Sequence, residues 1–281
     1  MSDAEALLTV AVEAARMAGG LLAERVRRGA EQDVEAKSTP TDLVSEADLA
    51  AERAIRELLA QRRPDDGFLG EEGGPEEHGG SGLSWVVDPL DGTVNFLFGI
   101  PQWSVSVAVR DDRGTIAGAV YDPNRDELFT ATREGGASLA GPAGEVELAG
   151  AARARRASGQ GEAPAPSVPE DLAAAMVATG LAYDSSVREA QAKVLARLVG
   201  RVRDVRRFGS AALDLAWTAA GRYDAYYERS VKAWDIAAGA LICERAGLQV
   251  LELPVHESLP WGILVARPEL AAPLFELVSG P

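Results

Sequence analysis

The sequence predicts a mixed fold, α+β in its first half and α/β in its second, stacked as a layered αβαβα sandwich. Two amphipathic helical patterns come before any strand, short β-rich runs separated by turns follow, and strands alternate with helices in the rest of the chain. A chain of 281 residues is long enough for two modest halves around a shared core, which we place at 1–145 and 146–281.

The first half opens with two predicted helices. Over 4–28 apolar residues recur at helical spacing, with most charges on the opposite face, and the pattern ends near Gly29. A second helical pattern covers 45–63 and stops at the turn-forming residues 64–67. Two helices therefore precede the first sheet.

The residues that follow predict an antiparallel sheet meander. Short runs of β-forming residues cover 85–87, 104–109, 116–121 and 127–132, with turn-forming clusters between them. The stretch 141–169 is rich in Ala, Gly, Pro and Arg and shows little periodicity. We interpret this stretch as the crossing between the two halves.

The sequence pattern of the second half predicts strands that alternate with helices. Such an alternation is typical of an α/β arrangement. Strands are expected at 174–179, 203–205, 225–227, 248–253 and 262–266, and helices at 188–198, 210–220, 236–245 and 268–277.

Composition narrows the classes of function. The chain has 28 Lys and Arg against 43 Asp and Glu, a net charge of −15, which is the wrong sign for a protein that follows a phosphate backbone, so nucleic acid is not expected as a ligand. The single cysteine, Cys243, cannot form an internal disulfide and lies in an apolar helical pattern. No apolar stretch approaches the roughly 20 residues of a membrane span, and the first residues are acidic. We expect a cytoplasmic protein with no membrane partner.

The most informative segment ends a buried-looking strand with two carboxylates, Asp88 and Asp91. Pro89 removes a backbone donor and fixes a turn, so both side chains and the Leu90 carbonyl can converge. Oxygen-only ligands suit Mg²⁺ or Mn²⁺, and two His and one Cys offer no cluster for a softer metal. The alternative is an Asx turn, since Asp-Pro and Asp-Gly are common loop dipeptides.

Two further acidic positions favour a metal site over a plain Asx turn. Glu71 lies in a second acidic turn, and Asp235 follows Trp234 at the start of a helix expected from Ile236. Each position has a structural alternative of its own, a solvated acidic loop for the first and a helix N-cap for the second.

Ordered motifs extend over nearly the whole chain. They are DLVSEAD at 42–48, GEE at 70–72, DPLDGTVNF at 88–96, RFGSAALD at 207–214, DAYYE at 224–228 and WDIAAG at 234–239. In these segments the chain resembles the inositol monophosphatase family of metal-dependent, lithium-sensitive phosphatases. Any one motif alone is weak, but their common order and spacing are not expected by chance.

The resemblance implies a set of metal ligands. Glu71, Asp88 and the carbonyl of Leu90 would hold a first Mg²⁺, and Asp88, Asp91 and Asp235 a second, so that Asp88 bridges the two. Glu71 would also contact a weaker third ion. Two ions about 3.5–4 Å apart can activate a water on one side of a phosphate and neutralise the leaving oxygen on the other.

The resemblance also implies catalytic roles for Thr93, Asp48 and Glu71. The Thr93 hydroxyl would orient the attacking water and would itself be held by Asp48. Ser45 and Asp48 have capping-box spacing, so Asp48 could instead only cap the second helix, and both roles can coexist. Gly92 and Thr93 begin a short helix whose backbone N–H groups can donate to phosphate oxygens.

Substrate contacts are implied for Glu228, Ser210 and Ala211, and Lys37 falls on a loop where the family places a mobile lysine near the metals. Glu228 matches the position that grips substrate hydroxyls, and its alternative is a plain surface charge. Lys37 is otherwise an ordinary exposed lysine.

The predicted function is a Mg²⁺-dependent hydrolase, a phosphomonoesterase for a small polyol phosphate, with inositol 1-phosphate foremost. Relatives on the same scaffold hydrolyse fructose bisphosphate, histidinol phosphate or the 3′-phosphate of adenosine bisphosphates, because substrate choice lies in loops. A regulatory binding protein connected with RNA polymerase and ribosomal RNA processing is the alternative from another class. The resemblance further implies inhibition by Li⁺ and a homodimer, whose interface we expect on the sheet meander and 153–169.

Overall fold

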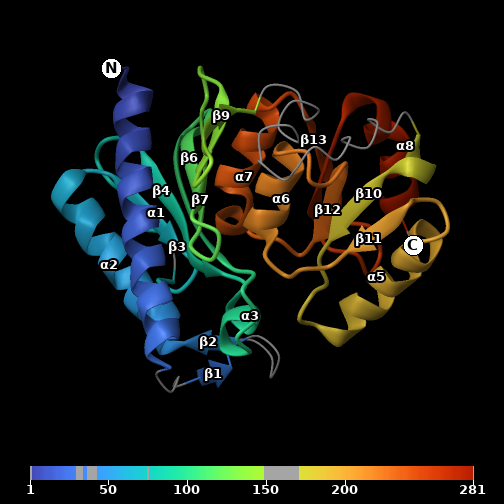
Figure 1. Ribbon diagram of the computed structural model, residues 1–281, viewed down its shortest axis with the longest axis horizontal. Coiled ribbons are helices and arrows are strands. Elements are labelled where there is room, and N and C mark those ends of the chain that lie inside the picture. Colours follow the sequence, from blue (N-terminus) through green and yellow to red (C-terminus); the bar gives the residue numbers. More distant parts are fainter. Residues whose placement is uncertain (1, 30–33, 37–42, 75, 149–170, 281) are drawn as a thin grey trace.

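The computed structural model describes residues 2–29, 34–36, 43–74, 76–148 and 171–280. Within these residues the elements stack in five layers, which confirms the predicted αβαβα sandwich (Figure 1). Two helices cover a seven-stranded sheet, two more lie between this sheet and a five-stranded one, and a last pair covers the outer face of the second sheet. The helices of these layers are α1 Asp3–Arg28 and α2 Glu46–Arg62, then α6 Ala211–Ala219 and α7 Ala233–Arg245, then α5 Ser185–Leu198 and α8 Pro268–Val278.

Helices α1 and α2 form the outer layer of the first half. The Ser2 hydroxyl accepts from the backbone of Glu5 at the start of α1, and Gly29 ends the helix with a left-handed φ of 61°. Its alanine-rich face packs against the first sheet. By length and composition alone α1 is apolar enough to cross a membrane, contrary to the sequence-based expectation, yet that apolar face is the one that contacts the core.

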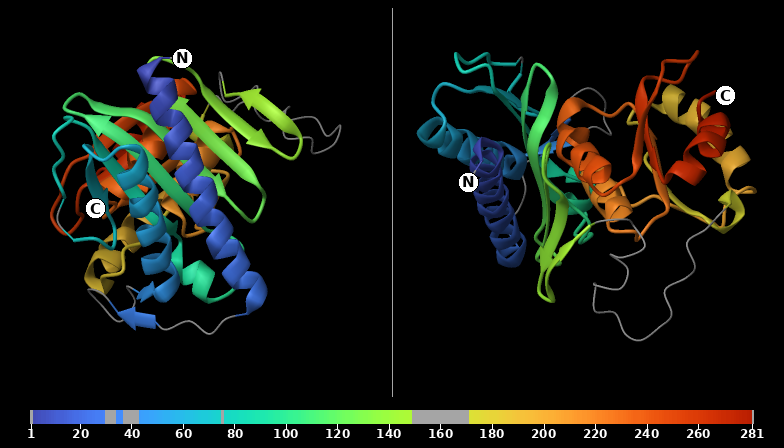
Figure 2. Two further views of the ribbon diagram at one scale, coloured as in Figure 1. Left: turned by 90° about the vertical axis from the view of Figure 1, so that its left-hand side faces the viewer. Right: turned by 90° about the horizontal axis from the view of Figure 1, so that it is seen from above.

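The first sheet has the strand order β3-β4-β5-β6-β7-β8-β9 (Figure 2). The expected meander is confirmed from β4 to β7, but β3 pairs parallel with β4, because the connection 71–83 provides the dozen or so residues that a parallel return needs. The strands are β3 Gly67–Gly70, β4 Ser84–Asp91, β5 Ser104–Asp111, β6 Gly114–Asp122, β7 Glu127–Thr132, β8 Ala137–Gly141 and β9 Gly144–Glu147.

The hairpin of β8 and β9 corrects the interpretation of 141–169 as one crossing, because its first residues belong to the sheet. Residues 149–170 lie outside the described part of the chain. The predicted boundary at 145 falls inside β9, and Gly118 of β6 lies so close to α7 that an added Cβ would be 2.8 Å from Cα of Ala238. The two halves therefore share a core.

Strand β4 continues through Pro89 instead of ending before it, which corrects the predicted turn. Asp88 pairs with Ser106 and Asp91 with Ser104, so the four residues from Asp88 to Asp91 oppose three on β5. This extra residue is a β-bulge, a feature that redirects side chains and tolerates the missing proline N–H. The bulge brings Asp88 and Asp91 to the same cavity.

The second sheet has the order β11-β10-β12-β14-β13, with β10 parallel to β11 and β12 and the other pairs antiparallel. The predicted alternation of the second half is confirmed, with shifted ends. Its elements are η1 Leu172–Ala174, β10 Met176–Thr179, β11 Asp204–Arg206, β12 Ala225–Arg229, β13 Gln249–Leu253 and β14 Gly262–Ala266. A separate two-stranded pair, β1 Val34–Ala36 and β2 Leu43–Ser45, precedes α2, and the one-turn helix α3 Thr93–Leu97 follows β4.

Candidate active site

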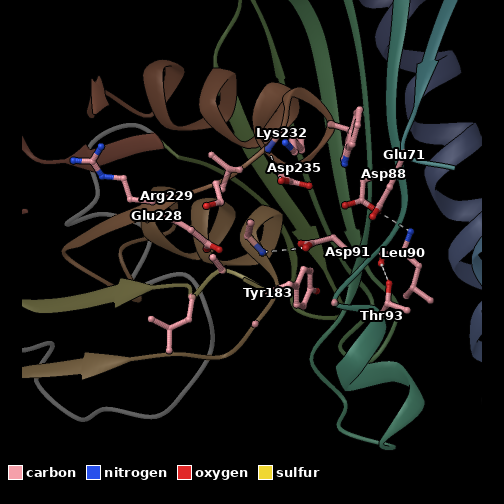
Figure 3. A pocket seen from close by; sticks show the side chains of 18 of the residues that line it. Glu71, Asp88, Leu90, Asp91, Thr93, Tyr183, Glu228, Arg229, Lys232 and Asp235 are labelled. Atoms are coloured by element: carbon pink, nitrogen blue, oxygen red, sulfur yellow. Dashed lines mark hydrogen bonds between the residues drawn. The ribbon is translucent and has the colours of Figure 1, made fainter. Parts of the chain in front are cut away.

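A cavity of about 240 Å³ opens between the two sheets (Figure 3). It lies where β4 ends, where α6 and α7 begin, and beside the end of β12. Most of the predicted site residues line it, namely Glu71, Asp88, Leu90, Asp91, Gly92, Thr93, Ala211, Glu228 and Asp235. Segments more than a hundred residues apart in sequence thus contribute to one site.

Asp88 is the most deeply placed carboxylate of the cavity. Its side chain is 2% exposed, and Oδ1 accepts from the backbone N–H of Leu90 at 3.0 Å. Glu71 follows β3, and its N–H donates to the Val87 carbonyl at 3.2 Å, which fixes Glu71 beside β4. Burial, followed by the negative charges of Glu71, Asp91 and Asp235, raises the pKa of Asp88 well above its ordinary value. The site thus concentrates negative charge.

Asp91 is held by the first turn of α6. Its carboxylate accepts from the Ser210 hydroxyl, from N–H of Ala212 at 2.7 Å and from N–H of Ala211 at 3.1 Å. Burial raises the pKa of Asp91 to about 6, although these hydrogen bonds oppose the shift. A carboxylate at a helix N-terminus is also favoured by the helix dipole.

Ser210, which is predicted to contact the substrate, lies against Asp91 in the structure. Its side chain is 1% exposed and lies behind the cavity wall, where its hydroxyl contacts Asp91 and accepts from the N–H of Leu213. Ser210 therefore holds Asp91, and its substrate contact stays a prediction. Ala211 does line the cavity, and its N–H also points to Asp91.

Asp235 lies in the first turn of α7, which begins at Ala233 and not at the predicted Ile236. Its Oδ2 accepts from the N–H of Lys232 at 2.6 Å, so the capping alternative describes a real contact. The carboxylate also lines the cavity, and burial together with the charges of Glu71 and Asp91 raises its pKa well above the ordinary value. Capping and membership of the acidic cluster thus coexist.

The donor set fits a hard divalent cation in its chemistry. In the described residues no three His, Cys, Asp or Glu side chains already stand in a group that could hold an ion. The four carboxylates nevertheless face one cavity and supply only oxygen, and the negative charges of their neighbours help to raise the pKa of Asp88 and of Asp235, which is the repulsion that a cation relieves.

Thr93 and Asp48 meet beside the acidic cluster. Thr93 Oγ1 donates to Oδ1 of Asp48 at 2.8 Å, while Oδ2 of the same carboxylate accepts from the N–H of Ser45 at 2.9 Å and from its hydroxyl. Asp48 therefore makes both expected contacts: it holds the Thr93 hydroxyl, and it caps the start of α2. Gly92, which precedes Thr93, has a φ of 98° that suits glycine, and an added Cβ would lie 3.0 Å from the Gln102 carbonyl.

Glu228 faces the cavity from β12 (Figure 3). Its Oε2 accepts from the Tyr226 hydroxyl at 2.8 Å, and burial raises its pKa to about 7 against the opposing effects of Tyr226 and Arg207. The alternative of a plain surface charge is therefore wrong. Tyr183 and Arg207 also line the cavity and were given no role from sequence, although Arg207 begins a recognised motif. Lys37 lies outside the described residues.

Comparisons with known proteins agree with this geometry. A model of the inositol monophosphatase family matches residues 3–274. An inositol-1-monophosphatase SuhB from Mycobacterium tuberculosis is 44% identical over 254 residues, covering 86% of this chain and 81% of its own, and a Nus factor SuhB from Pasteurella multocida is 40% identical over 262 residues, covering 92% and 90%.

Solved structures show the same fold. The extragenic suppressor protein suhB from Bartonella henselae superimposes with a TM-score of 0.81 at 32% identity, covering 97% of this chain and 98% of its own. Mycobacterium tuberculosis SuhB gives 0.78 at 36% identity, covering 99% and 97%. The family match supports a phosphatase that acts on a small phosphorylated substrate with the help of metal ions. With nearly the whole chain matched and the motif residues gathered at one cavity, this protein belongs to the inositol monophosphatase family.

Proposed function

We propose that this protein is a Mg²⁺-dependent phosphomonoesterase for a small polyol phosphate, with inositol 1-phosphate as the foremost substrate. The observation that supports the proposal is the arrangement of the cavity. A cluster of four carboxylates lies on one side, and Glu228, a carboxylate suited to hydroxyl groups, lies on another. A phosphate held at the cluster would direct its alcohol portion toward Glu228.

Glu71, Asp88 and the Leu90 carbonyl would hold one Mg²⁺, and Asp88, Asp91 and Asp235 the other. Two bound ions supply an activated water and neutralise charge on the leaving oxygen. Glu71 would also contact a weaker third ion, and Mn²⁺ can replace Mg²⁺ because it accepts the same oxygen ligands. Li⁺ would inhibit by replacing the second ion, as the family resemblance implies.

The chain's own residues orient the reactants. Because the Thr93 hydroxyl donates its hydrogen to Asp48, its oxygen lone pairs are left to accept a hydrogen bond from the attacking water, which turns that water's oxygen toward phosphorus. The backbone N–H groups of Gly92 and Thr93 lie at the cavity wall, where they can donate to phosphate oxygens. Water then adds to phosphorus as the bond to the alcohol oxygen breaks, giving inorganic phosphate and the free polyol.

Other functions fit the same cluster less specifically. Fructose bisphosphate, histidinol phosphate and adenosine bisphosphate carry a phosphate that the same carboxylates could process, and a panel of esters distinguishes them. The relative from Pasteurella multocida named a Nus factor makes a regulatory binding role the second candidate. The complete set of carboxylates favours the enzyme.

We further propose a cytoplasmic homodimer. Phe98, Ile100 and Phe208 are exposed, by 74% in the case of Phe98, and Asn95 connects their segments by donating to the Phe208 carbonyl at 2.6 Å and accepting from the N–H of Ile100. This apolar patch supports an interface at these residues and not on the sheet meander, since among described residues no strand of the first sheet exposes a large apolar side chain. Residues 153–169 lie outside the described part.

The test is phosphate release from a panel of phosphomonoesters, with and without Mg²⁺. We expect inositol 1-phosphate to be the best substrate and activity to stop in excess chelator and return with Mg²⁺. Full activity after verified metal removal contradicts the metal-dependent mechanism. A strong preference for another ester of the panel would retain the mechanism and replace the substrate.

A further inference from the structure

The carboxylate of Glu228 lies close to Gly180, the residue that follows β10. Strands β10 and β12 run parallel and their pairing ends with Thr179 opposite Tyr227, so Gly180 and Glu228 each follow the last paired residue. A Cβ built at Gly180 would lie 1.9 Å from Cδ and from Oε2 of Glu228, and 2.0 Å from Oε1. No side chain larger than hydrogen fits at position 180 while Glu228 keeps its place.

The backbone does not require glycine here. Gly180 is absent from the glycines with positive φ, in contrast to Gly92 at 98° and Gly209 at 85°. An alanine can therefore adopt the backbone conformation of Gly180 without strain. The structure therefore requires glycine at this position because a Cβ would not fit, and not because of the backbone conformation.

The Glu228 carboxylate is also held by a hydrogen bond from Tyr226. This tyrosine is fully buried, lies two residues earlier on β12, and donates its hydroxyl to Oε2 at 2.8 Å. The carboxylate is thus held by a buried donor and lies close against a backbone position without a side chain. Oε1 has no hydrogen-bond donor among the contacts described for Glu228 and borders the cavity, where it can accept from a ligand hydroxyl.

We propose that Gly180 is a positioning residue for polyol recognition, because its lack of a side chain seats the Glu228 carboxylate where the alcohol portion of the substrate binds. The proposal rests on the function proposed above. An alanine would force the carboxylate to withdraw by about 1.5 Å to reach the 3.4 Å of ordinary contact. That end of the glutamate is flexible, so the carboxylate moves and the fold stays.

The experiment combines Gly180→Ala and Glu228→Ala, singly and together, with inositol 1-phosphate and a simple aryl phosphate as substrates at saturating Mg²⁺. We expect Gly180→Ala to lower kcat/KM for the polyol ester about ten- to a hundredfold, as misplacement by about 1 Å can. The aryl ester has no hydroxyls for Glu228 and should change less than about twofold. In the double variant the alanine at position 180 should add no further loss, because no carboxylate remains to be displaced.

A matched control is Gly20→Ala, since Gly20 has nothing within 4 Å of an added Cβ and no positive φ. Equal losses on both substrates for Gly180→Ala, or an additive loss in the double variant, would overturn the positioning role. If Glu228→Ala discriminates between the esters and Gly180→Ala does not, the proposed function stands and this inference fails. If wild type does not hydrolyse polyol esters, the proposed function fails. A crystal structure of Gly180→Ala then still tests the inference, because it shows whether the carboxylate of Glu228 has moved away from Tyr226. An unmoved carboxylate refutes the inference.

Discussion

The hydroxyl of Thr93 donates to Asp48 at 2.8 Å across 45 residues of sequence, and the second oxygen of that carboxylate holds Ser45 at the start of α2. One buried side chain therefore connects a helix terminus to a threonine that lines the cavity. We expect both stability and catalysis to depend on Asp48, and mutation can separate the two contributions.

Asp48→Ala removes both contacts, whereas Ser45→Ala removes only the hydroxyl contact at the helix start. Both variants should lose stability, by about 1 kcal/mol for the capping contact. Only Asp48→Ala should lower kcat, by about a hundredfold or more, because Thr93 is no longer oriented to accept from the attacking water. Thermal unfolding and phosphate release measure the two effects. Equal activity losses in the two variants would reduce Asp48 to a capping residue.

Much of the fold follows from local sequence pattern. Local pattern predicts helices α1 and α2, because apolar residues recur at helical spacing over several turns. It also predicts strands β4 to β7, because each contains a run of β-forming residues bounded by turns. Strands β3, β8 and β9 were not predicted, since their sequences GFLG, ASLAG and GEVE are short and contain glycines that disfavour strands. Their pairing with longer neighbours overrides that weak propensity.

The site was predictable where its residues are close in sequence or fall in motifs. Asp88 and Asp91 are both supplied by one strand. The contact between Ser210 and Asp91 was not predictable, because the two residues are 119 apart in sequence and only the folded chain brings the start of α6 to the end of β4. The bulge at Pro89 was also missed, since a proline after an aspartate equally favours a turn.

The exposed patch of Phe98, Ile100 and Phe208 predicts where the homodimer forms. Phe98→Ser should raise the dimer dissociation constant more than about tenfold, because a symmetric interface loses the buried ring twice. Val255→Ser is the control, since Val255 is also exposed, by 69%, but lies between β13 and β14. Sedimentation at micromolar concentration gives the masses. A wild-type mass near 29.5 kDa would reject the dimer.

Glu228 predicts a pH-dependent preference between substrates. Its pKa of about 7 means that the side chain is an acceptor-only carboxylate above that pH and carries a donor O–H below it. The ratio of kcat/KM for inositol 1-phosphate to that for an aryl phosphate should therefore fall as the pH is lowered from 8 to 6. Glu228→Gln should lower the ratio about ten- to a hundredfold at pH 8, through loss of a charge-assisted hydrogen bond.

The same variant supplies the control for the pH effect, because a glutamine does not titrate. Its ratio should be flat over the range in which the wild-type ratio changes. A wild-type ratio that does not change between pH 8 and 6 would mean that Glu228 does not contact the alcohol portion.

The acidic cluster predicts that the metal-free protein is less stable at high pH. The pKa values of Asp91 and Glu228 are raised to about 6 and about 7, and those of Asp88 and Asp235 are raised as well, all by burial first. A raised pKa means that the folded state binds protons more tightly than the unfolded chain. The resulting stability is fully present below the unfolded pKa values and is lost as the pH rises through the folded ones.

In the presence of chelator, Tm should therefore fall between pH 5 and pH 8, with Glu228 alone contributing on the order of 3 kcal/mol at 1.36 kcal/mol per pKa unit. Added Mg²⁺ should raise Tm more at pH 8 than at pH 5, because ionised carboxylates bind the cation and protonated ones do not.

Asp235→Asn keeps an oxygen to accept from the N–H of Lys232 but removes one negative charge from the cluster. This variant should be more stable than wild type at pH 8 without metal, should gain less from Mg²⁺, and should lose activity. A metal-free Tm that is constant or rises from pH 5 to pH 8, in a wild type that binds Mg²⁺, would show that the carboxylates do not repel one another in the folded protein.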